Sequence, residues 1–145
     1  MTADTLMIFD VTLGSSDLER SGAFYDAALG TLGYERSPES LESWIGWGPK
    51  HDDGVSLWLT KPFDGKPPTA GNGTMITFRA NSEAEVHAFH KAALANGGSD
   101  EGAPGTRPHY EPTFYVAYVR DPDGNKLACV FHRHRPGRVD PLPRS

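Results

Sequence analysis

The chain has 145 residues, of which 37% are hydrophobic, and its 19 acidic and 14 basic side chains give a formal net charge of −5. This balance predicts one ordinary globular domain and excludes a chain that is disordered throughout. The only cysteine, Cys129, excludes a disulfide scaffold, and no apolar run is long enough to span a bilayer.

A strand followed by a capped helix occurs twice along the chain. Residues 7–14 are rich in strand-forming side chains, and Ser16, with a glutamate three positions later, predicts a helix that begins at Ser16. The same order recurs after 74–79, where Ser82 and a glutamate three positions later predict a second helix. This repetition, 66 positions from one serine to the other, predicts an internal structural duplication.

Apolar residues at helical spacing predict the buried faces of both helices. They are Leu18, Gly22, Tyr25, Leu29 and Leu32 in the first helix, and Val86, Phe89 and Ala93 in the second. Strand patterns follow each helix, at 43–47, 55–59, 114–120 and 126–132. The last two flank Asp121-Pro122-Asp123-Gly124, a sequence typical of a tight turn. The pattern therefore predicts two βαβββ modules.

We expect a single domain over residues 1–132. Module one spans about 7–60, module two spans about 74–132, and the Pro- and Gly-rich stretch 61–73 links them. Each module would make a thin core alone, so the two are expected to share one. Residues 133–145 form a basic, proline-rich tail, for which a solvated extension is favoured over a nucleic-acid arm because no aromatic residues interleave its arginines. With the acidic balance of the chain, this argues against a nucleic-acid partner.

Motifs at both ends of this region resemble a known superfamily. They are Val11-Thr12-Leu13-Gly14, Ser16-Asp17-Leu18-Glu19-Arg20-Ser21, Ala23-Phe24-Tyr25 and Asp121-Pro122-Asp123-Gly124-Asn125-Lys126. Together they resemble the vicinal-oxygen-chelate superfamily, which includes glyoxalase I, bleomycin-resistance proteins and extradiol dioxygenases. The resemblance extends to His132 and implies an α+β fold in which two βαβββ modules form a cupped mixed sheet around a pocket. It also implies a small-molecule ligand and a homodimer.

The usual chemistry of this superfamily needs a divalent metal ion, and the resemblance implies where its ligands would lie. The four positions hold Asp10, Trp58, Met75 and Ala128, on the first and last strands of the two modules. Only Asp10 offers an oxygen ligand, and a thioether suits soft metals. We therefore expect a retained scaffold with a dismantled metal site, and no cofactor.

Aromatic residues predict the character of the remaining pocket. Trp44, Trp47 and Trp58 fall on predicted strands of module one, and Tyr115 and Tyr118 fall on a strand of module two. They predict an aromatic wall for a flat or hydrophobic ligand, with plain core packing as the alternative. On the final strand, alternation places Cys129 on the face opposite Ala128, which predicts an inert buried thiol.

Polar residues give the candidate catalytic groups. Asp10 on the first strand is a candidate general base, and Glu111, in a loop before a strand, is a second candidate carboxylate. In the same loop Arg107 is placed to clamp an anionic substrate, and His109 to lie near the pocket mouth. The alternative is a hydrogen-bonded strand aspartate beside a solvated loop.

These observations favour a metal-independent protein that binds a small hydrophobic or aromatic molecule. One alternative is a lyase or isomerase in which Asp10 or Glu111 transfers a proton. Another is a metal-dependent lyase or dioxygenase that uses unorthodox ligands such as Asp10, Glu111 and His109. The lone cysteine and the lack of a signal-peptide pattern in the first ten residues favour a cytoplasmic location, with no membrane partner.

Overall fold

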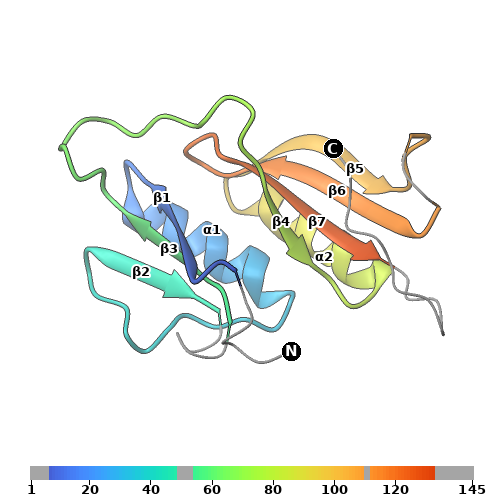
Figure 1. The fold of residues 1–145 in the computed structure, drawn as a ribbon, viewed down its shortest axis with the longest axis horizontal. Helices are drawn as coiled ribbons and strands as arrows, with labels where there is room; N and C mark the ends of the chain where they lie inside the picture. Colours follow the sequence, from blue (N-terminus) through green and yellow to red (C-terminus); the bar gives the residue numbers. More distant parts are fainter. Residues whose placement is uncertain (1–6, 49–53, 110–111, 133–145) are drawn as a thin grey trace.

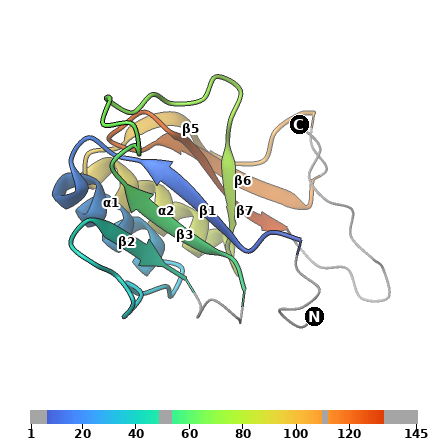
Figure 2. The same ribbon diagram turned by 60° about the vertical axis from the view of Figure 1, so that its left-hand side comes forward.

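The computed structural model describes residues 7–48, 54–109 and 112–132, so Glu111 and the tail at 133–145 lie outside the described residues. Two helices and seven strands follow in the order β1 (Asp10–Gly14), α1 (Leu18–Gly30), β2 (Trp44–Trp47), β3 (Ser56–Thr60), β4 (Ile76–Arg79), α2 (Glu83–Ala95), β5 (Ser99–Gly105), β6 (Phe114–Arg120) and β7 (Lys126–His132). They make two separate sheets (Figure 1), and the linker between β3 and β4 passes over one end of both (Figure 2).

The two sheets repeat one pairing scheme. In the first sheet the order is β1-β3-β2, and in the second it is β4-β7-β6-β5. The last strand of each module lies parallel to the first strand and antiparallel to the strand before it. In module one, the place of β5 is taken by two isolated bridges to β2, between Arg36 and Trp47 and between Leu41 and Trp44. The predicted α+β fold of two βαβββ modules is confirmed, with one strand of module one reduced to these bridges.

The helix starts show one agreement and one correction. α2 begins as predicted, because the side chain of Ser82 accepts a hydrogen bond from the backbone N–H of Glu85 at 3.1 Å. α1 is capped by Asp17, whose side chain accepts from the N–H of Arg20, and not by Ser16 as the sequence pattern predicts. Ser16 does not cap the helix because its hydroxyl bonds to module two, where it donates to Asp123 Oδ1 at 2.8 Å.

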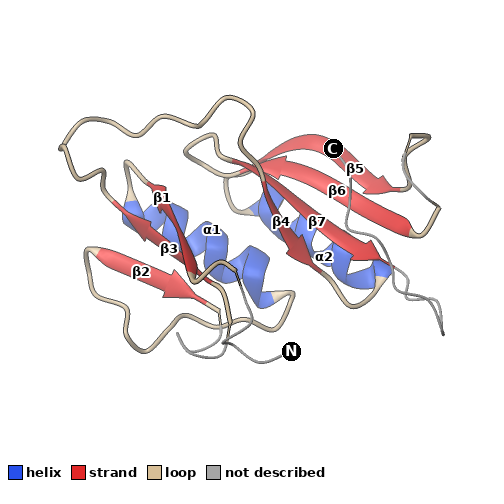
Figure 3. Cartoon of the chain, viewed as in Figure 1, coloured by secondary structure: helices blue, strands red, loops and turns tan. Residues whose placement is uncertain are grey.

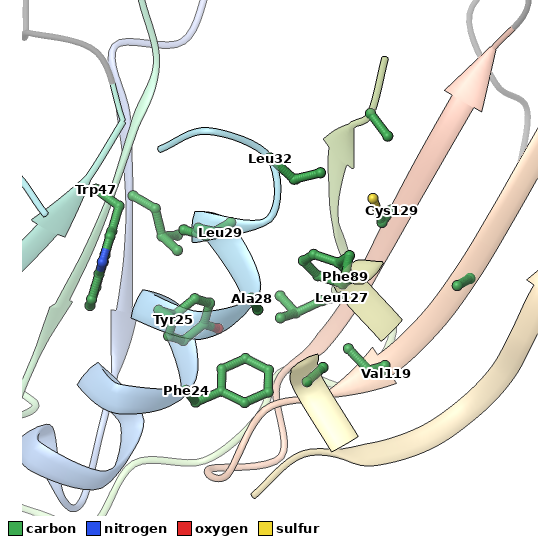
Figure 4. Packing of buried hydrophobic residues seen from close by; sticks show 14 of the residues in the cluster. Phe24, Tyr25, Ala28, Leu29, Leu32, Trp47, Phe89, Val119, Leu127 and Cys129 are labelled. Carbon is green, nitrogen blue, oxygen red and sulfur yellow. The ribbon is translucent and has the colours of Figure 1, made fainter. Parts of the chain in front are cut away.

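The shared core lies between the helices and the helix-facing sides of both sheets. α1 packs directly against α2, and buried residues of α1, including Phe24 and Ala28, lie beside Phe89 and Leu127 of module two (Figure 4). Leu29, by contrast, lies toward Trp47 of module one. One cluster therefore joins both modules, as expected from the size of each half. Neither helix in the described part of the chain is long and apolar enough to cross a membrane.

The turn between β6 and β7 ties the second module to the start of α1. Asp123 accepts from the N–H and hydroxyl of Ser16 through Oδ1, and from the hydroxyl of Ser21 through Oδ2 at 2.6 Å. Asp121, which is 3% exposed, accepts from the buried hydroxyl of Tyr25 at 2.6 Å. We call this set of contacts the aspartate clamp. It links residues about a hundred positions apart and fixes how the modules meet.

Candidate functional site

Both helices lie on one side of the sheets, and in the described part of the chain the other side, here called the open face, has no helix over it (Figure 3). Successive side chains of a strand point to opposite sides. Val11 and Leu57 pack with the main core, so they define the helix-facing side. Their neighbours Asp10 and Trp58 therefore lie on the open face of module one.

An aromatic pair occupies the open face of module one. The ring of Trp58 is 2% exposed, and its indole N–H donates to the hydroxyl of Ser56 at 3.0 Å. It lies against Gly46, where an added Cβ would be 2.5 Å from Cε3 of the indole. Trp44 is 38% exposed, and its ring centroid lies 6.0 Å from that of Trp58. Two of the three tryptophans named for the aromatic wall thus lie together, with Trp58 underneath and Trp44 accessible. Trp47, 1% exposed, instead packs in the main core.

Strand register relates the four substituted ligand positions to each other. Thr12 pairs with Trp58, and Thr77 pairs with Ala128, so Trp58 and Ala128 occupy equivalent places on β3 and β7. Asp10 and Met75 each lie two residues before the paired threonine of their module. The positions expected from the resemblance therefore form one pair on each module.

The residues at these positions do not suit the divalent metal that the superfamily implies. Asp10 and Met75 are exposed, but an indole and a methyl group have no lone pair for a metal, and a thioether suits soft ions. Within 7–48, 54–109 and 112–132, no three His, Cys, Asp or Glu side chains lie close enough to hold a metal ion. One carboxylate is too few for a Zn, Fe, Mn or Ni site.

On module two, the open face carries a tyrosine between two cations. Arg107 lies over the ring of Tyr118 at 5.5 Å, and the ammonium of Lys126 lies 5.3 Å from the same ring. Arg107 also donates to the carbonyl oxygen of Ala103 at 2.7 Å, so its guanidinium is already partly occupied. His109 is exposed in the following loop. Tyr118, one of the aromatic residues named in the sequence analysis, thus lies on the open face together with Val116.

Two residues of module two lie on the helix-facing side. Tyr115 packs with the main core, and a 2.6 Å hydrogen bond joins its hydroxyl and Nε2 of His87 on α2. The structure therefore does not bring Tyr115 together with Trp44 and Trp58. Cys129 is fully buried in the same core, where burial, with a smaller effect of Glu85, raises the pKa of its thiol to about 12. Such a thiol is unreactive at neutral pH, as the sequence predicts.

A cavity of about 180 Å³ lies at the seam between the two modules. Its lining combines apolar residues of the helix-facing side with exposed residues, and consists of Val11, Leu29, Tyr34, Trp47, Gly48, Val55, Ser56, Leu57, Ile76, Thr77, Phe78 and Arg79. Of the residues that the sequence analysis assigns to the pocket, Trp47 lines this cavity and the others do not. No local sequence pattern indicates it, because its walls come from five segments that only the tertiary structure brings together.

Comparison with known proteins agrees with this geometry. The sequence model of the Glyoxalase/Bleomycin resistance protein/Dioxygenase superfamily matches residues 8–129. No curated protein matches the chain significantly.

Solved structures with the same fold include two that span most of this chain. A glyoxalase/bleomycin resistance protein from Albidiferax ferrireducens T118 has 39% sequence identity and a TM-score of 0.76, and the match covers 88% of this chain and 100% of that one. A glyoxalase-related enzyme from Fulvimarina pelagi has 24% identity and a TM-score of 0.68, over 88% of this chain and 89% of that one. The second likeness concerns the fold alone.

Proposed function

Because the chain belongs to the Glyoxalase/Bleomycin resistance protein/Dioxygenase superfamily, we propose that it uses the family scaffold to bind a small hydrophobic or aromatic molecule without a metal ion. The observation that carries this proposal is the Trp44–Trp58 pair on the open face of module one. Trp58 of this pair stands at a position where the resemblance implies a metal ligand.

The geometry of this pair supports a binding surface for a flat ligand. Gly46 has no side chain, so the Trp58 ring settles onto the backbone and is held there by its hydrogen bond to Ser56. Trp44 keeps over a third of its surface exposed beside that ring. Offset aromatic stacking on such a ring adds roughly 0.5–1.5 kcal/mol beyond the burial of apolar area. Asp10, exposed on the first strand of the same sheet, supplies a polar group at the edge of this surface.

Proton transfer by Asp10 is the second candidate function. The observation that favours it is a carboxylate on the same open face as the aromatic pair. In that case Asp10→Asn abolishes turnover and leaves ligand binding unchanged. The metal-dependent alternative needs Glu111, which lies outside the described residues, together with Asp10 and His109.

The homodimer and the cytoplasmic location expected from the sequence stay predictions.

Indole is a suitable neutral probe for the aromatic surface, followed by isothermal titration calorimetry. We expect protein dialysed against EDTA to bind indole as tightly as untreated protein. Trp44→Ala removes the accessible ring and is expected to weaken binding at least about tenfold, whereas Trp44→Phe keeps a stacking surface and stays close to the parent. Equal binding by Trp44→Ala and the parent would contradict the proposal.

Elemental mass spectrometry of the same untagged, dialysed samples provides the control. We expect substoichiometric metal in the parent protein and the same content in Asp10→Ala. The variant is needed because histidines, such as His132, also hold adventitious metal. A stoichiometric metal that disappears with Asp10→Ala would overturn the metal-free proposal in favour of metal-dependent lyase or dioxygenase chemistry.

A further inference from the structure

The seam between the modules is bordered by two edge strands. β1 ends one sheet and β4 ends the other, and they run in opposite directions without pairing (Figure 1). The modules are joined by packing of α1 on α2 and by the aspartate clamp. The cavity of about 180 Å³ lies where these contacts leave the seam unfilled, and Gly48, which has no side chain, forms part of its wall.

The walls of this cavity are mainly apolar and belong to the core side of the molecule. Leu29, Trp47 and Leu57 come from module one, and Ile76 and Phe78 come from module two. All five pack with the main core. The cavity therefore lies apart from the rings of Trp44 and Trp58 on the open face, although Ser56 lines the cavity and also accepts the hydrogen bond of the Trp58 indole.

The size of the cavity limits its occupant to about one ring. An apolar protein cavity of roughly 150 Å³ is large enough to bind benzene, whereas pockets for drug-sized ligands measure roughly 300–1,000 Å³. At about 180 Å³ the seam cavity takes a single aromatic ring with a small substituent.

The charge at the cavity favours an anionic substituent. Arg79 lines it, is exposed, and makes no side-chain hydrogen bond or ion pair with any residue in the described ranges. Arg79 is also the last residue of β4, whose edge facing the seam has no strand partner in the described sheets and so presents free backbone N–H groups. A guanidinium beside backbone donors recognises a carboxylate through short, charge-assisted hydrogen bonds.

We propose that the seam cavity is a second ligand site, which binds a single-ring aromatic carboxylate with its ring between the modules and its carboxylate on Arg79. The lining of this site contains neither Trp44 nor Trp58, the two rings of the aromatic surface on the open face. Because its walls come from both modules, ligand bound there stabilises the way they are assembled.

Benzoate is the probe, with benzyl alcohol as its neutral counterpart, and both are titrated into the full chain by calorimetry. We expect benzoate to bind at least about tenfold more tightly than benzyl alcohol, since the neutral alcohol cannot form a charge-assisted hydrogen bond through a carboxylate. Arg79→Gln is expected to remove that preference, and Arg79→Lys to keep part of it. Val55→Phe, at a half-exposed lining position, is expected to weaken both ligands by filling the cavity.

The matched control is Lys91→Gln, an exposed charge on α2, which is expected to leave benzoate binding unchanged. Benzoate binding that is lost in Trp44→Ala but kept in Arg79→Gln and Val55→Phe would place the ligand on the open face and overturn the seam site. Equal affinity for benzoate and benzyl alcohol, or no binding of benzoate at millimolar concentration, would also overturn it. The interpretation of these outcomes does not depend on whether indole binds to the aromatic surface on the open face.

Discussion

Gly46 determines how the tryptophan pair fits on the open face. A Cβ at this position would lie 2.5 Å from the Trp58 ring, closer than side-chain atoms approach each other in folded proteins. Trp58 is 2% exposed and therefore has no free direction in which to move. The absence of one side chain on β2 thus makes room for the large one on β3 that faces it.

Gly46→Ala is expected to lower the free energy of unfolding by about 1–3 kcal/mol, because overpacking forces the Trp58 ring or the strand backbone to shift. Urea titration measures this loss, and tryptophan fluorescence reports a change in the Trp44–Trp58 contact. Gly30→Ala is the matched control, since Gly30 ends α1 with no atom within 4 Å of an added Cβ. There we expect no loss, and equal destabilisation by the two variants would refute this account of Gly46.

At the scale of the elements, the cap of α1 shows how tertiary contacts decide which of two neighbouring residues caps a helix. Ser16 and Asp17 are both good N-cap residues, and the glutamate after Ser16 favours the serine. In the folded chain Ser16 donates to Asp123, which leaves Asp17 to accept from the N–H of Arg20 at 3.0 Å. The helix is therefore capped one residue later than the sequence predicts, at Asp17 and not at Ser16.

Replacing the cap tests this assignment. Asp17→Ala is expected to cost about 0.5–2 kcal/mol of stability, because the first turn of α1 loses its side-chain acceptor. Asp17→Asn keeps an acceptor and is expected to stay near the parent. Chemical denaturation followed by far-UV circular dichroism compares the two variants, and a loss for Asn as large as that for Ala would contradict the capping role.

Local periodicity explains why most elements could be predicted. The spacing of Val86, Phe89 and Ala93 marks the buried side of α2, and the turn at Asp121–Gly124 marks the hairpin of β6 and β7. The exception was the side of the sheet that Tyr115 faces. The prediction used the aromatic character of this residue and not its place between Phe114 and Val116. Because strand side chains alternate, that place points Tyr115 toward the helices.

The site was only partly predictable, for a physical reason. Residues such as Asp10 and Ala128 could be placed by resemblance, since strand order and register fix them. The seam cavity and the aspartate clamp depend on how two modules meet, and each joins residues of both modules. In the sequence the Asp-Pro-Asp-Gly stretch indicates a turn, and nothing local shows that its carboxylates reach α1.

At the scale of the whole molecule, the aspartate clamp places a carboxylate where little solvent reaches it. The side chain of Asp123 is 3% exposed. Burial alone would raise its pKa, but hydrogen bonds from the Ser16 N–H and from the Ser21 and Ser16 hydroxyls outweigh burial and lower the pKa below its usual 3.8. For Tyr25, burial and then the neighbouring Asp121 carboxylate raise the pKa of the hydroxyl, which therefore stays a donor.

The direction of the Asp123 shift sets the expected pH dependence of stability. A carboxyl with a lower pKa in the folded state stabilises the fold above its unfolded pKa of about 3.8 and loses this contribution as the pH falls through its folded pKa. Asp123→Asn is therefore expected to unfold about 1–3 kcal/mol more easily at pH 7, with the difference shrinking below pH 4. Urea titrations across this range measure it. Glu35→Gln, an exposed control, should show no such trend, and a pH-independent difference for Asp123→Asn would argue against the clamp.

The clamp also bears on the order in which the chain acquires its structure during synthesis. Ser16 and its acceptor Asp123 are 107 positions apart. At about 5–20 residues per second, a ribosome takes several seconds or more to make the intervening chain. Throughout that interval the start of α1 lacks its acceptor and the apolar side of module one lacks its cover. This protein therefore most needs protection from aggregation during the period when the first module has been synthesised and the second has not.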